Sequence, residues 1–299
     1  MLLCNSNITF PDILTISQTG RYIVAGALIS TPLNVGFLSM STQRSESDWS
    51  KFLTHFRAGE DCTAFSWHAL FGQIQAKPGM ISVIGQLGQS LDGRIATVTG
   101  HSKYINGHDG LLHLHRLRAL VDAVVVGAGT VVADNPKLTV RMVEGPHPAR
   151  VLIDPNGRVP ASSGLYQNDG VDRMVFTSKQ NRQNYPEGVD VVLVEKDING
   201  RVPPAIILGT LRDKGYRRVL IEGGADTVTK FMLAGCLDRV HVILAPMVIG
   251  AGRPSFDLPV IESLKDAIRM PMKMHPIGKE VVLDCDLSSL RLVASSVSR

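Results

Sequence analysis

Cysteine, aromatic residues and charge are all scarce in this sequence. Of its 299 residues, 4 are Cys, 5% are aromatic and 19% are charged. No two cysteines form a CxxC pair, which argues against a zinc ribbon or a disulfide framework and fits a reducing compartment. The chain has no block of Lys or Arg and few aromatic rings, so nucleic acid is a poor candidate for a partner. The cysteines are Cys4, Cys62, Cys236 and Cys285.

Long hydrophobic runs are missing as well. The apolar run Tyr22–Ile29 is far shorter than the roughly 18 residues that a membrane span needs, and no basic region precedes it as in a signal peptide. We therefore expect a cytoplasmic protein that does not bind membranes. The net charge of +4 is mildly basic. It has two interpretations, ordinary surface composition or an anionic, phosphorylated ligand.

The sequence pattern changes near Lys77–Gly79. Residues 1–79 are poorly patterned, and we expect an N-terminal extension of unknown function, with a hairpin over 13–29 and a helix from Asp48. That helix would place Trp49, Phe52, Leu53 and Phe56 on one face. One hypothesis is that translation starts at Met40. Residues 80–299 are regular and form the expected main domain.

From residue 80 onward, short apolar runs alternate with amphipathic segments. This alternation predicts a largely parallel sheet covered by helices on both faces. Strands are predicted over 81–87, 124–126, 150–153, 174–177, 189–194, 218–221 and 239–245, helices over 107–120, 204–214 and 227–234, and antiparallel closing strands over 272–276 and 280–285.

The stretch Val121–Arg141 (VDAVVVGAGTVVADNPKLTVR) is the most informative part of the chain. Its apolar run 123–127 has the length and Val content of a buried parallel strand. The run breaks into Gly127–Thr130 and is followed by Asp134 and Arg141. Because ligands of open α/β sheets bind at the carboxyl ends of strands, this pattern predicts a site, and most simply an enzyme's site.

The stretch Val219–Thr227 (VLIEGGADT) has the same form. A strand ends in Glu222, passes through Gly223 and Gly224, and enters a helix whose first amides and dipole suit a phosphate group. The alternative is a tight turn that needs glycine for packing alone. Glu222, which points toward the same region, favours a functional site.

Other candidate motifs are weaker. The sequence lacks both the third glycine of GxGxxG and a GK[ST] pair, so neither a Rossmann fingerprint nor a P-loop is present. The segment 90–96 (SLDGRIA) is interpreted as a turn. His113 and His115 are two residues apart and do not share a helix face, so we expect ordinary surface or partly buried histidines.

Five segments together resemble one family, the pyrimidine reductases of riboflavin biosynthesis, which form the carboxyl-terminal half of a bifunctional deaminase–reductase. The resemblance implies a dihydrofolate-reductase-like three-layer α/β/α fold. It also implies NADPH-dependent reduction of 5-amino-6-(5-phosphoribosylamino)uracil to the ribitylamino compound. The segments are SLDGRIA (90–96), HRLRALVDAVVVGAGTVVADNPKLTVR (115–141), VLIDPNGRVP (151–160), IEGGADT (221–227) and APMVIGAGRP (245–254).

The family's site positions can be carried over motif by motif. Asp134 and Glu222 fall at positions that orient ribose hydroxyls or relay a proton. Thr177, Ser178 and Lys179 are candidates for the 2′-phosphate of NADPH, and residues 224–230 for its pyrophosphate. The resemblance places along the cofactor Gly88, Tyr104, Thr130, Asp134, Ser178, Gly224, Ala225, Asp226 and Thr227. It places at the substrate Ser102, Arg118, Leu138, Arg141 and Glu222.

The sequence departs from the family pattern in two positions. Tyr104 stands where Trp is common, and Asn135 stands where an acid is usual. The deaminase motifs H-x-E and P-C-x-x-C, which hold zinc, do not occur. We therefore expect no deaminase activity and no metal.

Two alternatives to the reductase hypothesis stay open. The same fold could reduce a diaminopyrimidine or a pterin, although Arg118 and Arg141 favour a phosphorylated pentose because guanidinium groups bind phosphate in bidentate fashion. The chain could also be a catalytically silent nucleotide-binding protein. Family members commonly form homodimers, which we expect here.

Overall fold

The computed structural model describes residues 46–181 and 183–291. The hairpin expected over 13–29, Cys4 and Met40 lie outside these residues. Within them, no helix is both long and apolar enough to cross a membrane.

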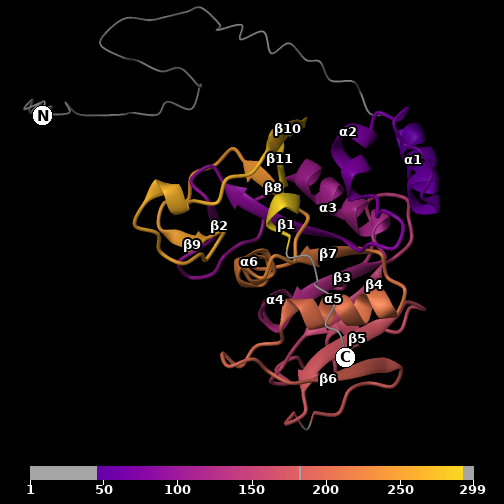
Figure 1. Cartoon of the computed structure of the whole chain (residues 1–299), viewed down its shortest axis with the longest axis vertical. Coiled ribbons are helices and arrows are strands. Elements are labelled where there is room, and N and C mark those ends of the chain that lie inside the picture. Colours follow the sequence, from indigo (N-terminus) through magenta and orange to yellow (C-terminus); the bar gives the residue numbers. More distant parts are fainter. Residues whose placement is uncertain (1–45, 182, 292–299) are drawn as a thin grey trace, which may run out of the picture. The chain divides into compact units, whose positions relative to one another are not determined.

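Nine strands of the described chain form one sheet (Figure 1). From β8 to β6 in the order given below, each pair of neighbouring strands is parallel. Strand β11 pairs antiparallel with β8, and β10 pairs antiparallel with β11. The mostly parallel sheet with antiparallel carboxyl-terminal strands is therefore confirmed. In spatial order the strands are β10 (Met272–Ile277), β11 (Glu280–Asp286), β8 (Arg239–Ala245), β1 (Ser82–Ser90), β7 (Arg218–Glu222), β3 (Ala123–Gly127), β4 (Ala149–Ile153), β5 (Arg173–Ser178) and β6 (Val189–Val194).

Helices cover both faces of the sheet, as the three-layer α/β/α prediction requires. Strand β3 shows why: Val124 and Val126 point into one hydrophobic cluster, and Ala123 and Val125 into the other. The first cluster lies under α1 (Glu46–Ala58), α2 (His68–Phe71) and α3 (His108–Leu120). The second lies under α5 (Pro204–Asp213) and α6 (Ala225–Leu233).

The smaller elements lie outside these layers. The sequence did not predict the short helix α4 (Ala128–Asp134), which follows β3 directly, or the ribbon of β2 (Arg94–Thr97) and β9 (Gly252–Pro254). Single 3-10 turns are η1 (Gly72–Ile74), η2 (Gly164–Tyr166), η3 (Leu264–Asp266) and η4 (Ser288–Leu290).

The order of the strands positions the site. The chain builds β3 to β6 outward in sequence, and then returns to insert β7 between β1 and β3. The carboxyl ends of β1, β7 and β3 therefore meet at one edge of the sheet. A change of direction of this kind is where open α/β sheets form a ligand crevice.

Helix α1 belongs to the same packing unit as the sheet. The expected apolar face is confirmed, since Trp49, Phe52 and Phe56 are buried in one cluster with Leu117 and Leu120 of α3. The described residues, 46–181 and 183–291, belong to one compact unit. Packing is therefore continuous across residue 79, where the sequence pattern changes.

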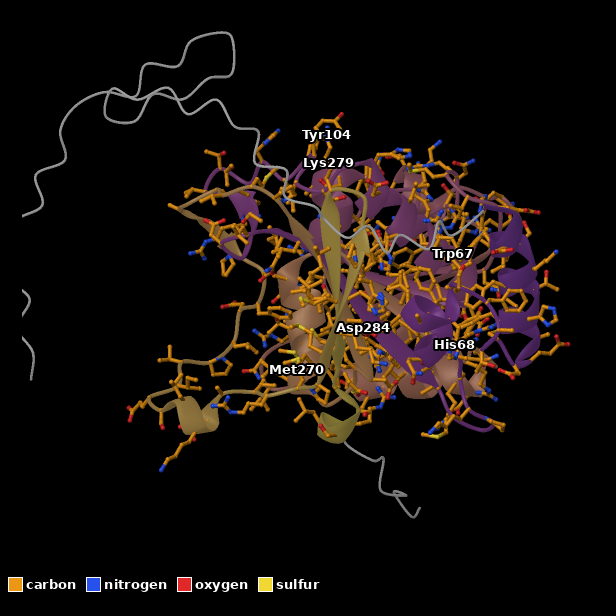
Figure 2. The ribbon with its side chains drawn as sticks, turned by 90° about the horizontal axis from the view of Figure 1, so that it is seen from above. Trp67, His68, Tyr104, Met270, Lys279 and Asp284 are labelled. Atoms are coloured by element: carbon orange, nitrogen blue, oxygen red, sulfur yellow. The ribbon has the colours of Figure 1, made fainter. Side chains whose placement is uncertain are left out.

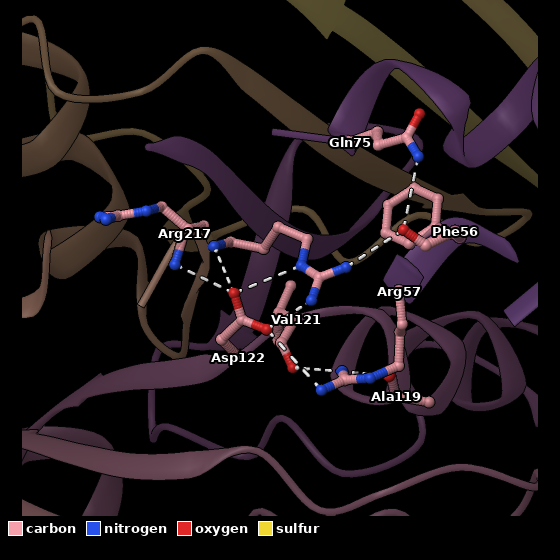
Figure 3. Close-up of polar contacts among 8 residues, drawn as sticks. Phe56, Arg57, Gln75, Ala119, Val121, Asp122 and Arg217 are labelled. Carbon is pink, nitrogen blue, oxygen red and sulfur yellow. Dashed lines mark hydrogen bonds and ion pairs between the residues drawn. The ribbon is translucent and has the colours of Figure 1, made fainter. Parts of the chain in front are cut away.

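Asp122, just before β3, joins α1 to the sheet at the edge opposite the site (Figure 3). Its carboxylate accepts from the backbone N–H groups of Arg217 and Arg218, at 3.0 and 2.8 Å, and pairs with the Arg218 guanidinium at 2.6 Å. The same guanidinium donates to the carbonyl of Phe56 in α1. Burial alone would raise the pKa of Asp122, but these hydrogen bonds and the Arg218 charge hold it below its usual value.

The role of α1 in the fold can be tested with Phe52→Ala. Because the Phe52 ring is fully buried, we expect the variant to lose about 3–5 kcal/mol of unfolding free energy in urea titrations. Lys51→Ala, on the exposed side of the same helix, is the control and should change stability by less than about 0.5 kcal/mol. Equal, small effects would show that α1 is dispensable for folding.

Candidate functional site

Two strand-to-helix turns are joined by a hydrogen bond between them. Thr130 lies in α4, directly after β3, and Gly224 lies between β7 and α6. The backbone N–H of Gly224 donates to Thr130 Oγ1 at 3.0 Å. The sequence argument requires the strand ends near residues 130 and 222 to converge, and the structure confirms that they do.

Glycine is required in both turns for packing. Gly223 has φ of +118°, and a Cβ atom there would lie 2.8 Å from Thr130 Oγ1. A Cβ atom at Gly127 would lie 2.5 Å from Thr227 Oγ1. Packing alone therefore accounts for these two glycines, and phosphate binding at the start of α6 stays a prediction.

Arg118 and Glu222 form a buried ion pair beside these turns. Arg118 Nε donates to Glu222 Oε2 at 2.9 Å, and Nη2 contacts Oε1. The third donor, Nη1, reaches the carbonyl of Thr139 at 3.1 Å. Both residues were predicted to contact substrate, and the structure brings them together as partners. Removing one partner of such a pair costs about 3–5 kcal/mol, since it leaves the other charge buried alone.

The segment from Leu138 to Arg141 runs along the other side of Arg118. Leu138 is buried and has φ of +55°, so this segment begins in the left-handed region. The N–H of Val140 donates to His147 Nδ1 at 3.2 Å, and the N–H of Arg141 donates to His115 Nδ1 at 3.0 Å. The side chain of Arg141 is exposed. Of the two predicted substrate arginines, Arg141 is the accessible one.

The histidines of α3 are more deeply buried than the sequence suggested. His113 and His115 are 1% and 2% exposed, which corrects the expectation of surface or partly buried side chains. His113 hydrogen-bonds His241 of β8 at 3.0 Å, a partner too distant in sequence to foresee. Burial, and then the nearby charges of Arg118 and Arg141, lower the pKa of His115 to about 4.

Asn135 ends α4 and supports the next loop. It has φ of +43°, which Asn tolerates better than most residues, and its Oδ1 accepts from Ser163 Oγ and the N–H of Gly164. The preceding residue, Asp134, carries an exposed carboxylate. The departure from an acid at position 135 therefore has a structural reason.

A second anchor holds the chain between β2 and α3. The carboxylate of Glu280, in β11, accepts from Asn106 Nδ2 at 2.9 Å and from the N–H groups of Gly107 and Gly110 at the start of α3. A Cβ atom at Gly88 would lie 1.6 Å from Asn106 Oδ1. Gly88 was predicted to contact cofactor, and it must be glycine because Asn106 packs against it.

The anchored segment carries Ser102 and Tyr104. Tyr104 has φ of +68° and is 84% exposed, and Figure 2 shows its ring projecting from the surface. Within the described residues, no hydrogen bond or aromatic contact holds the ring in place, so it is free to stack on a flat ligand.

The segments 90–96 and 245–254 are bound to each other. Asp92 accepts from Ser90 Oγ and from the N–H groups of Ile249 and Gly250, which lowers its pKa to about 2. The turn expected over 90–96 is confirmed for residues 91–93, whereas Ser90 ends β1 and residues 94–97 form β2. The turn holds the loop that follows β8.

The remaining candidates lie in two places, at the end of β5 and in α6. Thr177 and Ser178 end β5, two strands from β3, and Ser178 Oγ accepts from the N–H of Gln180. A hollow of about 320 Å³ at the ends of β5 and β6 is lined in part by Ser178, Lys179 and Lys196. Lys179 pairs with Glu195 at 2.8 Å. Ala225, Asp226, Thr227 and Lys230 lie in α6, and Asp226 pairs with Lys230.

Sequence reasoning missed His115, His147, Asn106 and Glu280 as supports of the site. One signal was present, because His115 precedes the singled-out Arg118 by three residues and so lies on the same helix face. Glu280 and Asn106 are separated by 174 positions, and nothing local indicates their contact.

An open, mostly parallel sheet with helices on both faces and polar groups at the ends of β1, β7 and β3 defines the class as a three-layer α/β/α protein with a strand-end site. Residues 82–283 match the model of the RibD C-terminal domain. The chain belongs to this family.

Relatives of known name agree with this assignment. The chain is 32% identical, over 68% of its length, to the 2,5-diamino-6-ribosylamino-4(3H)-pyrimidinone 5′-phosphate reductase of Methanothermobacter thermautotrophicus and covers 96% of that protein. It is 34% identical, over 65% of its length, to the riboflavin biosynthesis protein RibD of Aquifex aeolicus but spans only 54% of it.

A solved structure supports the same fold. The crystal structure of the Thermotoga maritima diaminohydroxyphosphoribosylaminopyrimidine deaminase/5-amino-6-(5-phosphoribosylamino)uracil reductase superimposes with a TM-score of 0.60 at 26% identity. The match covers 69% of this chain and 56% of that one.

Thr130→Val tests the contact between the two turns. Valine has the shape of threonine but cannot accept a hydrogen bond, so the partly buried N–H of Gly224 loses its partner. We therefore expect a loss of about 1–3 kcal/mol in unfolding free energy. Thr130→Ser keeps the hydroxyl and should retain most of the stability. Equal losses in both variants would mean that the methyl group, and not the hydrogen bond, matters.

The lowered pKa of His115 predicts a pH dependence of stability. The unfolded chain binds this proton near pH 6.5 and the folded chain only near pH 4, so stability falls as pH decreases between these values. Thermal melts should show a smaller decrease over this window in His115→Asn, which cannot titrate there. An identical decrease in both proteins would contradict the assignment.

Proposed function

We propose that this chain is an NADPH-dependent reductase that converts 5-amino-6-(5-phosphoribosylamino)uracil to 5-amino-6-(5-phosphoribitylamino)uracil in riboflavin biosynthesis. The observation that carries the proposal is the convergence of two turns, joined from Gly224 to Thr130, beside the buried pair Arg118–Glu222. Family membership supports the proposal, and the archaeal relative is named as a reductase of a phosphorylated ribosylaminopyrimidine.

The residues at the strand ends suit a long dinucleotide. The start of α6, from Gly224 onward, offers amides and a helix dipole to a pyrophosphate. The hollow at the ends of β5 and β6 lies along the same edge, and its lining sets Lys179 and Lys196 against Glu195 and Asp197. Ser178 and these two lysines are the proposed contacts of the 2′-phosphate that distinguishes NADPH from NADH, with Lys179 leaving its pair with Glu195. Thr130 and Asp134, in α4 directly after β3, lie between these two places, and Gly88 lies in β1 on the other side of β7. The exposed ring of Tyr104 can stack against the cofactor.

The substrate side is proposed around Arg141. Its exposed guanidinium suits the ribose 5-phosphate. Ser102 and the backbone of the buried Leu138 are proposed to line the same site. Arg118 acts from beneath, since its donors are taken by Glu222 and the carbonyl of Thr139.

The two carboxylates have different roles in this proposal. Both oxygens of Glu222 accept from Arg118, which suits it to orienting a ribose hydroxyl. Asp134 is exposed at the end of α4 and relays the proton. When bound, the nicotinamide supplies the hydride for C1 of the opened ribose, and the chain contributes the alignment of the two carbons.

Two further properties belong to the proposal. The chain acts in the cytoplasm, which the free, buried thiols of Cys62, Cys236 and Cys285 support. It forms a homodimer, for which the edge strand β10 offers exposed Met272 and Met274.

The aminated pyrimidine is a second candidate substrate, because the archaeal relative is named for it and is covered almost completely. The direct experiment follows NADPH oxidation with the deaminated and the aminated ribosylaminopyrimidine phosphates side by side. Turnover of the deaminated compound supports the proposal. Turnover of the aminated compound alone would mean that the aminated pyrimidine is the substrate. Tight NADPH binding without turnover of either favours a binding protein.

Arg141→Ala tests the substrate site. We expect the KM for the phosphorylated pyrimidine to rise at least about tenfold, since a charge-assisted contact contributes about 1.5–3 kcal/mol, while the Kd for NADPH stays nearly constant. Arg212→Ala, which removes an exposed arginine from α5, is the matched control and should change neither constant. Equal losses of substrate and cofactor binding would contradict the role of Arg141.

A further inference from the structure

We propose that His115 is a positioning residue that holds the backbone of Arg141 so that its guanidinium meets the substrate phosphate. This inference rests on the proposed function, and it gives a role to a histidine that the sequence argument set aside. The contact that carries it is the hydrogen bond from the N–H of Arg141 to His115 Nδ1, 3.0 Å long.

The two residues before Arg141 are each held by a side chain from outside the segment. The carbonyl of Thr139 accepts from Arg118, and the N–H of Val140 donates to His147. The third contact alone falls on Arg141 itself. It comes from α3, 26 positions earlier in the chain, so the backbone of an exposed arginine is fixed to a buried helix.

The chemistry of the contact restricts which residue can make it. Because Nδ1 accepts a hydrogen bond from the backbone, the ring is neutral and carries its own hydrogen on Nε2. A cation in its place would repel both Arg118 and Arg141, the charges that act on this ring. The position therefore needs a buried, uncharged acceptor.

A fixed backbone matters at this point because arginine binds phosphate through paired hydrogen bonds of strict geometry. The side chain of Arg141 is long and exposed, so the fold can fix the position of its backbone but not that of its guanidinium. If the backbone N–H loses its partner, the segment shifts and fewer side-chain conformations reach the phosphate.

Three substitutions at His115 distinguish the loss of the hydrogen-bond acceptor from a change in side-chain volume. His115→Asn places an amide oxygen where Nδ1 lies, whereas His115→Leu keeps that shape without an acceptor and His115→Gln moves the polar group to the Nε2 position. We expect His115→Leu and His115→Gln to raise the KM for the phosphorylated pyrimidine about tenfold, and His115→Asn to stay within about threefold of the wild type. The KM for NADPH should hardly change.

The same substitutions in an Arg141→Ala background test whether His115 acts through Arg141. Once the guanidinium is gone, His115→Leu should raise the KM no further. His113→Asn is the matched control, since His113 lies on the same helix but bonds His241. It should leave the ratio of the two KM values unchanged.

Several results would overturn the inference. The first is an unchanged KM for the phosphorylated pyrimidine in His115→Leu and His115→Gln. The second is an increase in this KM by His115→Leu that is equal with and without the Arg141 side chain. The third is a His115→Asn variant that is folded, as shown by thermal melting, yet has the same KM as the His115→Leu variant. Calorimetry with ribose 5-phosphate provides a readout without turnover. If the wild type binds it and the effects follow the same pattern, the inference holds even where neither pyrimidine is reduced and the proposed function fails. If ribose 5-phosphate does not bind and neither pyrimidine is reduced, the inference falls together with the proposed function.

Discussion

The hydrogen bond from the N–H of Gly224 to Thr130 Oγ1 is the contact on which the site depends. It is possible only because β7 is inserted between β1 and β3, which brings two strand-to-helix turns to the same edge. Gly127 and Gly223 allow the turns to approach, since a side chain on either would overlap a threonine of the other turn. The glycine pattern thus records a packing constraint.

The buried pair Arg118–Glu222 extends this constraint from the sheet to α3 and to the carbonyl of Thr139. A buried ion pair adds little net stability, but it demands one geometry because neither charge can be left alone. The exposed groups, Arg141, Asp134 and Tyr104, are therefore carried on a frame whose polar atoms are already partnered. This division suits a site in which the frame is fixed and the ligand contacts are accessible.

Much of this arrangement could be predicted from the sequence. The Val-rich run 123–127 and the alternation after residue 80 indicated parallel strands, and parallel strands place their ends at one edge, so the convergence near residues 130 and 222 followed. The helix α4 could not be predicted, because a stretch with Gly129 and two valines has weak helix propensity. The burial of His113 and the contact of Glu280 with Asn106 depend on partners 128 and 174 positions away, which no local pattern contains.

The most direct measurement is hydrogen exchange of the full chain with NADPH, with the phosphorylated pyrimidine, and with both. The account predicts that NADPH protects the amides at the start of α6 and the beginning of α4, and that the pyrimidine protects the segment around residues 138–141. Protection by NADPH elsewhere in the sheet, with no change at these two turns, would contradict it.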